Sequence, residues 1–202
     1  MPSQELFDHV LKETLGWGTA RHAWLVYGLV RWLQPKVVVE TGALCGYMTL
    51  HILKGLEENG FGHVYAIDPF IERGSGAQLH NTCQRAGLSH RLTILDGRSE
   101  DVPWPSLVDM AVIDGDHSHE AVVYDCNQAV GRAASCLCLH DTYELSGPRD
   151  YVDRFASEAP EDWGLIEGVF DYGFSVFVKR GKPPGTGPER EYWDAREAAA
   201  KS

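Results

Sequence analysis

The chain has 202 residues, about the length of one domain, and 44% of them are hydrophobic. It carries 18 Lys and Arg against 29 Asp and Glu, which gives a formal net charge of −11. This surplus of acid argues against a protein that binds the phosphate backbone of nucleic acids or an anionic membrane surface. We also expect no signal peptide and no membrane-spanning segment. The five cysteines, an odd number, predict reduced thiols and a cytoplasmic location.

Short apolar runs alternate with helical patterns through the middle of the chain. The first run, Val37–Glu40, is β-branched without polar alternation, which is typical of a strand buried on both faces. Strands are predicted at Val37–Glu40, Val64–Asp68, Leu92–Leu95, Met110–Asp114 and Ser135–Asp141. Helices are predicted at Ala20–Leu33, Tyr47–Glu58, Gly76–Ala86, His119–Val130 and Pro148–Glu158. Five strands separated by helices indicate a parallel sheet.

The end of this region has a different pattern. Gly164–Val169 and Ser175–Val178 flank a turn at Asp171–Gly173, which predicts an antiparallel hairpin added to the sheet. We therefore expect one α/β domain, Rossmann-like, with a mostly parallel seven-stranded sheet, a C-terminal antiparallel hairpin and helices on both faces. The domain is placed at residues 1–180, with a helical N-terminal region at 1–34 that can act as a lid. Residues 181–202 are expected to form a loosely ordered tail.

Acidic residues stand at the ends of four of the five predicted parallel strands. They are Glu40, Asp68, Asp114 and Asp141. A single acid of this kind would be explained as a helix cap or a solvated loop residue. Four acids at strand ends are expected on one rim of the sheet, where open α/β folds bind their ligands. The pattern therefore favours a ligand site over four separate caps.

The turn after the first strand, Glu40–Tyr47, has the spacing G-x-x-x-G at Gly42 and Gly46. Taken alone, it also fits an ordinary tight turn between a strand and a helix. It lacks the middle glycine of the dinucleotide fingerprint, which argues against a bound diphosphate. Asp68 ends the second strand, where a carboxylate can accept hydrogen bonds from the two hydroxyls of a ribose. An adenosine-type ligand with a positive charge fits best, which points to S-adenosylmethionine (SAM).

These residues resemble a known family. Glu40–Tyr47 is similar to the glycine-rich motif of the catechol O-methyltransferases. Ile113–His119, with its Asp-Gly-Asp-His stretch, and His140–Thr142 resemble the metal-dependent sugar O-methyltransferases of macrolide and aminocoumarin biosynthesis, and cephalosporin-hydroxylase-like proteins share that pattern. The resemblance covers roughly Gly18–Tyr143. It implies a methyltransferase fold and a SAM-dependent, divalent-metal-dependent O-methyltransferase.

The resemblance also implies roles for individual residues. Gly42 and Gly46 would flank the methionine end of SAM, Asp68 would bind the ribose, and Gly97–Ser99 would lie beside the adenine. The expected cofactor-binding set is Glu40, Gly42, Ala43, Gly46, Tyr47, Asp68, Gly97, Arg98, Ser99 and Asp114.

A divalent metal, Mg²⁺ or Mn²⁺, is expected at Asp114 and Asp141, with His140 or Thr142 beside them. Magnesium prefers oxygen ligands, so a coordinating His140 would favour a softer or more tolerant metal; alternatively, His140 packs at the strand end. His117 is three residues past Asp114, where the family carries its general base, and Asp116 ranks second for that role. A metal-bound hydroxyl is acidified and held in place, and a nearby histidine can take its proton.

The expected acceptor is a small hydroxylated molecule, namely a sugar, a vicinal diol or a catechol, with no nucleic acid or membrane partner. Whether the chain forms a homo-oligomer is left open. Two other functions remain open: a non-catalytic SAM-binding protein on the same fold, and an NAD-type oxidoreductase, which the G-x-x-x-G spacing disfavours. Trp24 is expected in the core, and Trp17 in either the core or an acceptor pocket. Cys136 and Cys138 are expected to be buried core residues instead of zinc ligands.

Overall fold

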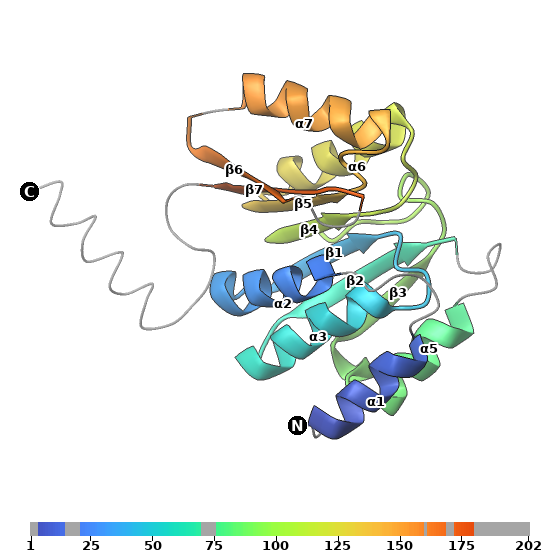
Figure 1. Cartoon of the computed structure of the whole chain (residues 1–202). Coiled ribbons are helices and arrows are strands. Elements are labelled where there is room, and N and C mark those ends of the chain that lie inside the picture. The colour runs from blue at the N-terminus through green and yellow to red at the C-terminus, as the bar shows by residue number, and fades with distance from the viewer. Residues whose placement is uncertain (1–3, 15–20, 70–75, 160, 169–171, 180–202) are drawn as a thin grey trace, which may run out of the picture.

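The computed structural model describes residues 4–14, 21–69, 76–159, 161–168 and 172–179 (Figure 1). The predicted tail at 181–202, Trp17, and Asp171 of the predicted turn lie outside the described residues. The domain boundary at residue 180 therefore stays a prediction.

The described strands form one seven-stranded sheet in the order β3-β2-β1-β4-β5-β7-β6. The strands are β1 (Val37–Thr41), β2 (His63–Asp68), β3 (Leu92–Asp96), β4 (Met110–Ile113), β5 (Cys136–His140), β6 (Trp163–Gly168) and β7 (Phe174–Lys179). The first five are parallel, and β7 runs antiparallel to both β5 and β6. The chain moves outward from β1 to β3 and then returns to β4 on the other side of β1. This change of direction leaves a crevice at the carboxyl ends of β1 and β4.

Helices cover both faces of the sheet, as predicted (Figure 1). One face carries α1 (Gln4–Thr14), α2 (Arg21–Leu33), α3 (Tyr47–Asn59) and α5 (Gly76–Arg85); the other carries α6 (His119–Gly131) and α7 (Ser146–Glu158). A short 3₁₀-helix, η1 (Ser89–Arg91), leads into β3. Side chains alternate along each strand, so Val38 joins the core under α2 and α3, whereas Val39 joins the core under α6 and α7. The expected α/β architecture is confirmed.

Two local predictions, for Trp24 and for the cysteines of β5, have different outcomes. The expectation that Trp24 lies in the core is wrong: it is 44% exposed, and its ring meets those of Phe7 and His51 edge-on at centroid distances of 6.3 and 4.7 Å. Trp24 is displaced from the core because Ala23 and Val26 occupy the buried face of α2. The expectation that Cys136 and Cys138 are buried in the core is confirmed.

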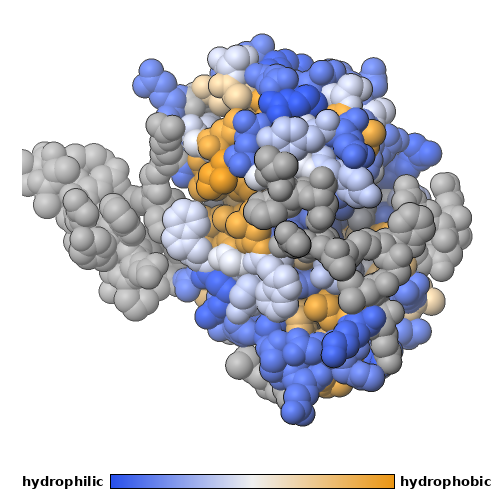
Figure 2. All heavy atoms as spheres, in the orientation of Figure 1, coloured by the Kyte–Doolittle hydropathy of each residue, from blue (hydrophilic) through white to orange (hydrophobic). Residues whose placement is uncertain are grey.

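Mostly hydrophilic residues cover the face seen in Figure 2, with a hydrophobic band where Figure 1 places β6 and β7. Leu165 and Ile166 of the edge strand β6 are among the exposed apolar residues. Within the described ranges, no helix combines the length and the hydrophobicity that crossing a bilayer requires.

A buried histidine packs α3 against the helices beside it. His51 is fully buried, its Nδ1 lies 2.9 Å from the backbone oxygen of Tyr47, and its Nε2 has no hydrogen-bond partner among the described residues. Burial lowers the pKa of His51 to about 4, aided by the charge of Lys54, although the hydrogen bond to Tyr47 acts in the opposite direction. The folded protein therefore keeps this ring neutral at a pH where an unfolded chain protonates it.

We expect acid to destabilise the protein through His51. Between pH 6.5, the ordinary histidine pKa, and pH 4, the unfolded chain binds a proton that the folded chain excludes, so the free energy of unfolding falls as pH falls. The full loss is about 3 kcal/mol. Urea unfolding of the wild type and of His51→Leu across pH 4–8 measures it. Above pH 7 the two proteins should differ in unfolding free energy by a constant amount, and below pH 6.5 the wild type should lose stability relative to the variant. A constant difference across the whole pH range would contradict the prediction.

Candidate functional site

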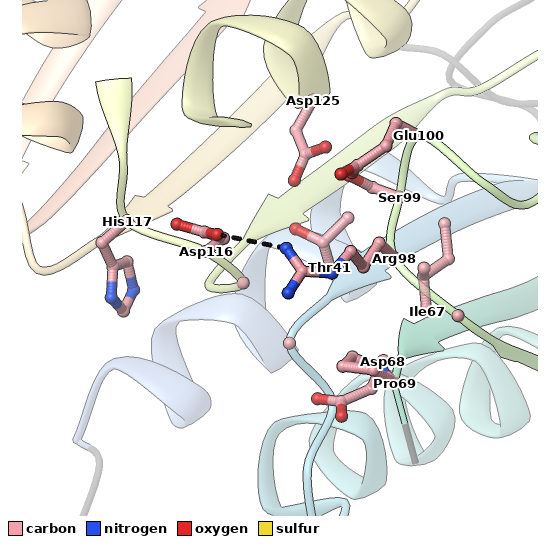
Figure 3. A pocket seen from close by; sticks show the side chains of 13 residues that line it. Thr41, Ile67, Asp68, Pro69, Arg98, Ser99, Glu100, Asp116, His117 and Asp125 are labelled. Carbon is pink, nitrogen blue, oxygen red and sulfur yellow. Dashed lines mark hydrogen bonds and ion pairs between the residues drawn. The ribbon is translucent and has the colours of Figure 1, made fainter. Parts of the chain in front are cut away.

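A cavity of about 340 Å³ opens at the carboxyl ends of the central strands (Figure 3). It is lined by Thr41, Gly42, Ile67, Asp68, Pro69, Gly97, Arg98, Ser99, Glu100, Gly115, Asp116, His117 and Asp125. The lining includes five of the expected cofactor-binding residues, namely Gly42, Asp68, Gly97, Arg98 and Ser99, and both expected catalytic residues. The other five expected cofactor-binding residues, Glu40, Ala43, Gly46, Tyr47 and Asp114, are not part of this lining.

The glycine turn after β1 forms one wall of the cavity. Gly42 has a φ of 81°, and a Cβ on it would overlap the backbone oxygen of Asp114, which follows β4. Its N–H donates to the backbone oxygen of Ile67 at 2.9 Å. Gly46, with a φ of 91°, is the N-cap of α3, and its N–H donates to the backbone oxygen of Ala43 at 2.8 Å. The first glycine is needed because the turn passes directly against the end of β4.

Replacing Gly42 should damage both stability and ligand binding. We expect Gly42→Ala to lose at least about 2 kcal/mol of unfolding free energy, because a left-handed backbone and a steric overlap add together. Gly60→Ala is the matched control: Gly60 also has a φ of 81°, but open space surrounds its Cβ position. Thermal unfolding should show a clearly smaller loss for the control. Equal losses in the two variants would mean that the contact with Asp114 contributes nothing.

Asp68, at the end of β2, supports the same turn. It is 2% exposed, and its Oδ2 accepts a hydrogen bond from the N–H of Leu44 at 3.1 Å. Its backbone oxygen accepts from the N–H of Gly97 at 3.1 Å. One residue thus ties together the loops that follow β1, β2 and β3. The expected contact with a ribose remains a prediction.

Glu40 lies beneath the turn and outside the cavity lining. It is buried, and the hydroxyl of Thr49 donates to its Oε2 at 2.6 Å. Burial raises the pKa of Glu40 to about 8, and the nearby charges of Asp114 and Asp68 act in the same direction while Thr49 opposes them. Near neutral pH this side chain is therefore largely uncharged.

Asp116, the second-ranked base, faces a different way from His117. Its Oδ2 lies 3.9 Å from Nη1 of Arg98, and Figure 3 shows this pair reaching toward each other between two loops of the cavity. Its Oδ1 accepts from the N–H of Ser118 at 2.9 Å, and this hydrogen bond lowers the pKa of Asp116. Ser118 is the N-cap of α6. A carboxylate with a lowered pKa is a weaker base than a histidine.

Beside the cavity, three of the expected residues form a group that can hold a metal ion. One ligand atom each from Asp114, His140 and Asp141 all lie within 4.8 Å of one another. Nδ1 of His140 is 3.1 Å from Oδ1 of Asp114 and 3.0 Å from Oδ1 of Asp141. The backbone of Asp141 has a φ of 56°, a left-handed conformation that Asp tolerates better than most residues. This turn directs the chain away from β5 at the point where the carboxylate meets the group.

His117 lies against the same group. Its Nε2 is 3.2 Å from Oδ2 of Asp141 and 3.5 Å from Oδ1 of Asp114. The nearby carboxylate of Asp114 raises the pKa of His117 despite its burial. Burial lowers the pKa of His140, but the adjacent carboxylates of Asp114 and Asp141 outweigh this and raise it to about 10. The two carboxylates thus attract positive charge, which a histidine proton or a cation can supply.

Thr142, the alternative third ligand, is directed elsewhere. It is fully buried, and the hydroxyl of Ser175 donates to its Oγ1 at 3.0 Å. The ring of His140 is held by packing against His22 of α2, with ring centroids 4.2 Å apart. His22 in turn stacks on Phe174 at a centroid distance of 5.1 Å. The structure therefore places His140, and not Thr142, with the two aspartates.

Sequence reasoning missed several cavity residues: Thr41, Ile67, Pro69, Glu100, Gly115 and Asp125. Asp125 had a usable signal. It lies on the buried face of α6 with Val122, Cys126 and Ala129, where an apolar residue is the rule. A charged residue on such a stripe indicates a partner or a ligand.

Solved structures share this fold. An O-methyltransferase from Bacillus cereus, solved with S-adenosylhomocysteine (SAH), is 17% identical over 89% of this chain and 92% of its own, with a TM-score of 0.68. An O-methyltransferase of tomaymycin synthesis from Streptomyces achromogenes, solved with SAM, is 18% identical over 89% and 91%, with a TM-score of 0.66. A methyltransferase from Geobacter sulfurreducens is 16% identical over 89% and 91%, with a TM-score of 0.63. At such low identity these similarities establish the fold.

The sequence comparison establishes the family. No curated protein sequence matches the chain. A family model described as a methyltransferase domain matches residues 39–142, which is just over half of the chain. The matched segment runs from β1 through β5 and includes Gly42, Asp68, Asp114 and Asp141. The chain therefore belongs to this methyltransferase-domain family.

Proposed function

We propose that this protein is a SAM-dependent O-methyltransferase that acts on a small hydroxylated molecule held at a divalent metal ion. One observation carries the proposal: Asp114 links the two parts of the site. Its carboxylate is in the group with His140 and Asp141, and its backbone oxygen touches Gly42 in the cavity wall. A methyl donor in the cavity would thus lie next to an acceptor oxygen held at Asp114, His140 and Asp141, as a direct displacement requires.

The chemistry of the cavity fits SAM. Four of the described residues that line it are acidic (Asp68, Glu100, Asp116 and Asp125), against one arginine, Arg98, and one histidine, His117. Such a lining favours a cationic sulfonium over a diphosphate. Gly42, Ala43, Gly46 and Tyr47 are proposed for the methionine end, Asp68 for the ribose and Gly97–Ser99 for the purine. Proteins of the same fold solved with SAM or SAH support SAM as the ligand of this cavity.

The group at Asp114, His140 and Asp141 offers two carboxylate oxygens and one imidazole nitrogen. A nitrogen ligand suits Mn²⁺ better than Mg²⁺, which prefers oxygen alone. When bound, a divalent ion lowers the pKa of a coordinated hydroxyl and fixes its oxygen. His117 is proposed to take the proton of that hydroxyl, because its Nε2 already lies within 3.5 Å of both aspartates. A sugar, vicinal diol or catechol would suit this group because two adjacent oxygens can chelate one ion.

Calorimetry tests the cofactor directly. We expect SAM and SAH to bind and NADH not to bind, and Asp68→Asn to weaken SAH binding at least about 10-fold, the value of one charge-assisted hydrogen bond of about 1.5 kcal/mol. Methyl transfer from labelled SAM to catechols and sugars, with Mn²⁺ present, then tests the reaction. Tight binding of NADH without binding of SAM or SAH would refute the proposal.

A further inference from the structure

The function proposed above pairs the cavity carboxylate of Asp125 with no particular group of SAM. Asp125 lies on the buried face of α6, is 2% exposed and lines the cavity. In Figure 3 its carboxylate points from the helix toward Ser99 and Thr41, while His117 lies apart from it. The Asp125 carboxylate is therefore directed into the part of the cavity that is away from Asp114, His140 and Asp141.

Two polar atoms in this part of the cavity lack a protein partner in good hydrogen-bond geometry. Oδ1 of Asp125 and Oγ1 of Thr41 are buried and have no hydrogen-bond partner among the described residues. Buried polar atoms are normally paired, so two unpaired atoms at a cavity wall indicate a ligand that pairs with them. Burial raises the pKa of Asp125 to about 6, although the nearby hydroxyls of Ser99 and Thr41 oppose the shift. At pH 8 the carboxylate is therefore ionised and can only accept hydrogen bonds.

We propose that Asp125 recognises the purine of the methyl donor by accepting a hydrogen bond from its exocyclic amino group. The inference rests on the proposed function, because it takes the presence of SAM in the cavity as given. The reacting methyl must lie near the metal group, at the end of the cavity marked by Gly42 and His117. The purine is then left with the other end, where Ser99 and Asp125 lie.

A second acid, Glu100, lines the same end but suits this role less well. Its side chain is exposed and already interacts with the hydroxyl of Ser99, at 3.3 Å from Oγ to Oε2. When a ligand offers no hydrogen bond to an exposed carboxylate, water can supply one, with little loss of binding free energy. At buried Asp125 the wrong ligand leaves the acceptor unpaired, and that penalty is the source of discrimination between similar ligands.

The experiment compares SAH with S-inosylhomocysteine, in which a carbonyl oxygen replaces the exocyclic amino group. At pH 8 we expect the wild type to bind SAH at least about 10-fold more tightly, because the carbonyl oxygen would face a carboxylate. In Asp125→Asn the amide can present either its oxygen or its NH₂ group, so the preference should shrink to within about 3-fold. Asp125→Ser, whose hydroxyl both donates and accepts, should also lower it.

Glu100→Gln is the matched control, since it removes the same charge from the same end of the cavity. It should keep the wild-type preference, and thermal unfolding of the unliganded variants should be recorded in parallel. An unchanged preference in the Asp125 variants, even with a lowered melting temperature, would show a structural role only and overturn the inference. Tight but indiscriminate binding by the wild type would overturn it too. Binding of neither compound would instead refute the proposed function.

Discussion

Asp141→Asn is expected to reduce Mn²⁺ affinity by more than about 100-fold and to abolish metal-dependent methyl transfer, because it removes one of two anionic ligands. Asn is the right substitution, since it keeps the size of the side chain and tolerates the φ of 56° at this position. Titration of Mn²⁺ into the protein, followed by calorimetry or by electron paramagnetic resonance, measures the affinity without any acceptor.

The control for this prediction is Asp150→Asn, which removes the same charge from an exposed position on α7, 3.9 Å from His119. It should bind Mn²⁺ like the wild type. Asp114→Asn should behave like Asp141→Asn, whereas SAH binding should survive in Asp141→Asn because Asp141 does not line the cavity. Full turnover of the wild type in excess chelator would show that no metal takes part.

The centre of the sheet could be predicted from the sequence because β1, β2, β4 and β5 each have a short, buried apolar run. Val37–Thr41 and Met110–Ile113 lie side by side in register, and both are buried on two faces, which requires the uninterrupted hydrophobic pattern that the sequence shows. The predicted ends of the parallel strands also predicted part of the site. Asp114 and Asp141 follow adjacent parallel strands, so their carboxylates meet at one rim although they are 27 positions apart in the sequence.

What could not be predicted depends on how helices rotate about their own axes. Trp24 and Asp125 are two opposite examples. The apolar ring of Trp24 is nearly half exposed, whereas the charged side chain of Asp125 is buried at the cavity. Periodicity gives the spacing of a helical face but not which ligand or neighbour that face meets. The sequence also could not predict that Asp116 faces Arg98, because the conformation of a loop decides this.

His117→Ala should lower turnover by roughly 10²–10⁴-fold, the usual contribution of a positioned acid or base, while SAH affinity changes little. The ring lies within 3.5 Å of both aspartates, so an oxygen bound there would be within its reach. His117→Gln keeps a polar side chain that cannot take up the proton, and it should be as slow as the alanine variant. If it restores turnover, His117 serves only as a hydrogen-bonding group.

His119→Ala is the matched control for His117, because His119 is two residues away, nearly half exposed and directed toward Asp150 on α7. Its turnover should equal that of the wild type. Asp116→Asn tests the competing base: this carboxylate has a lowered pKa and faces Arg98, so its loss should cost much less than that of His117. The opposite order, with Asp116→Asn inactive, Mn²⁺ still bound and His117→Ala active, would assign the proton transfer to Asp116. The position of His117 between the cavity and the two aspartates is the physical reason to expect otherwise.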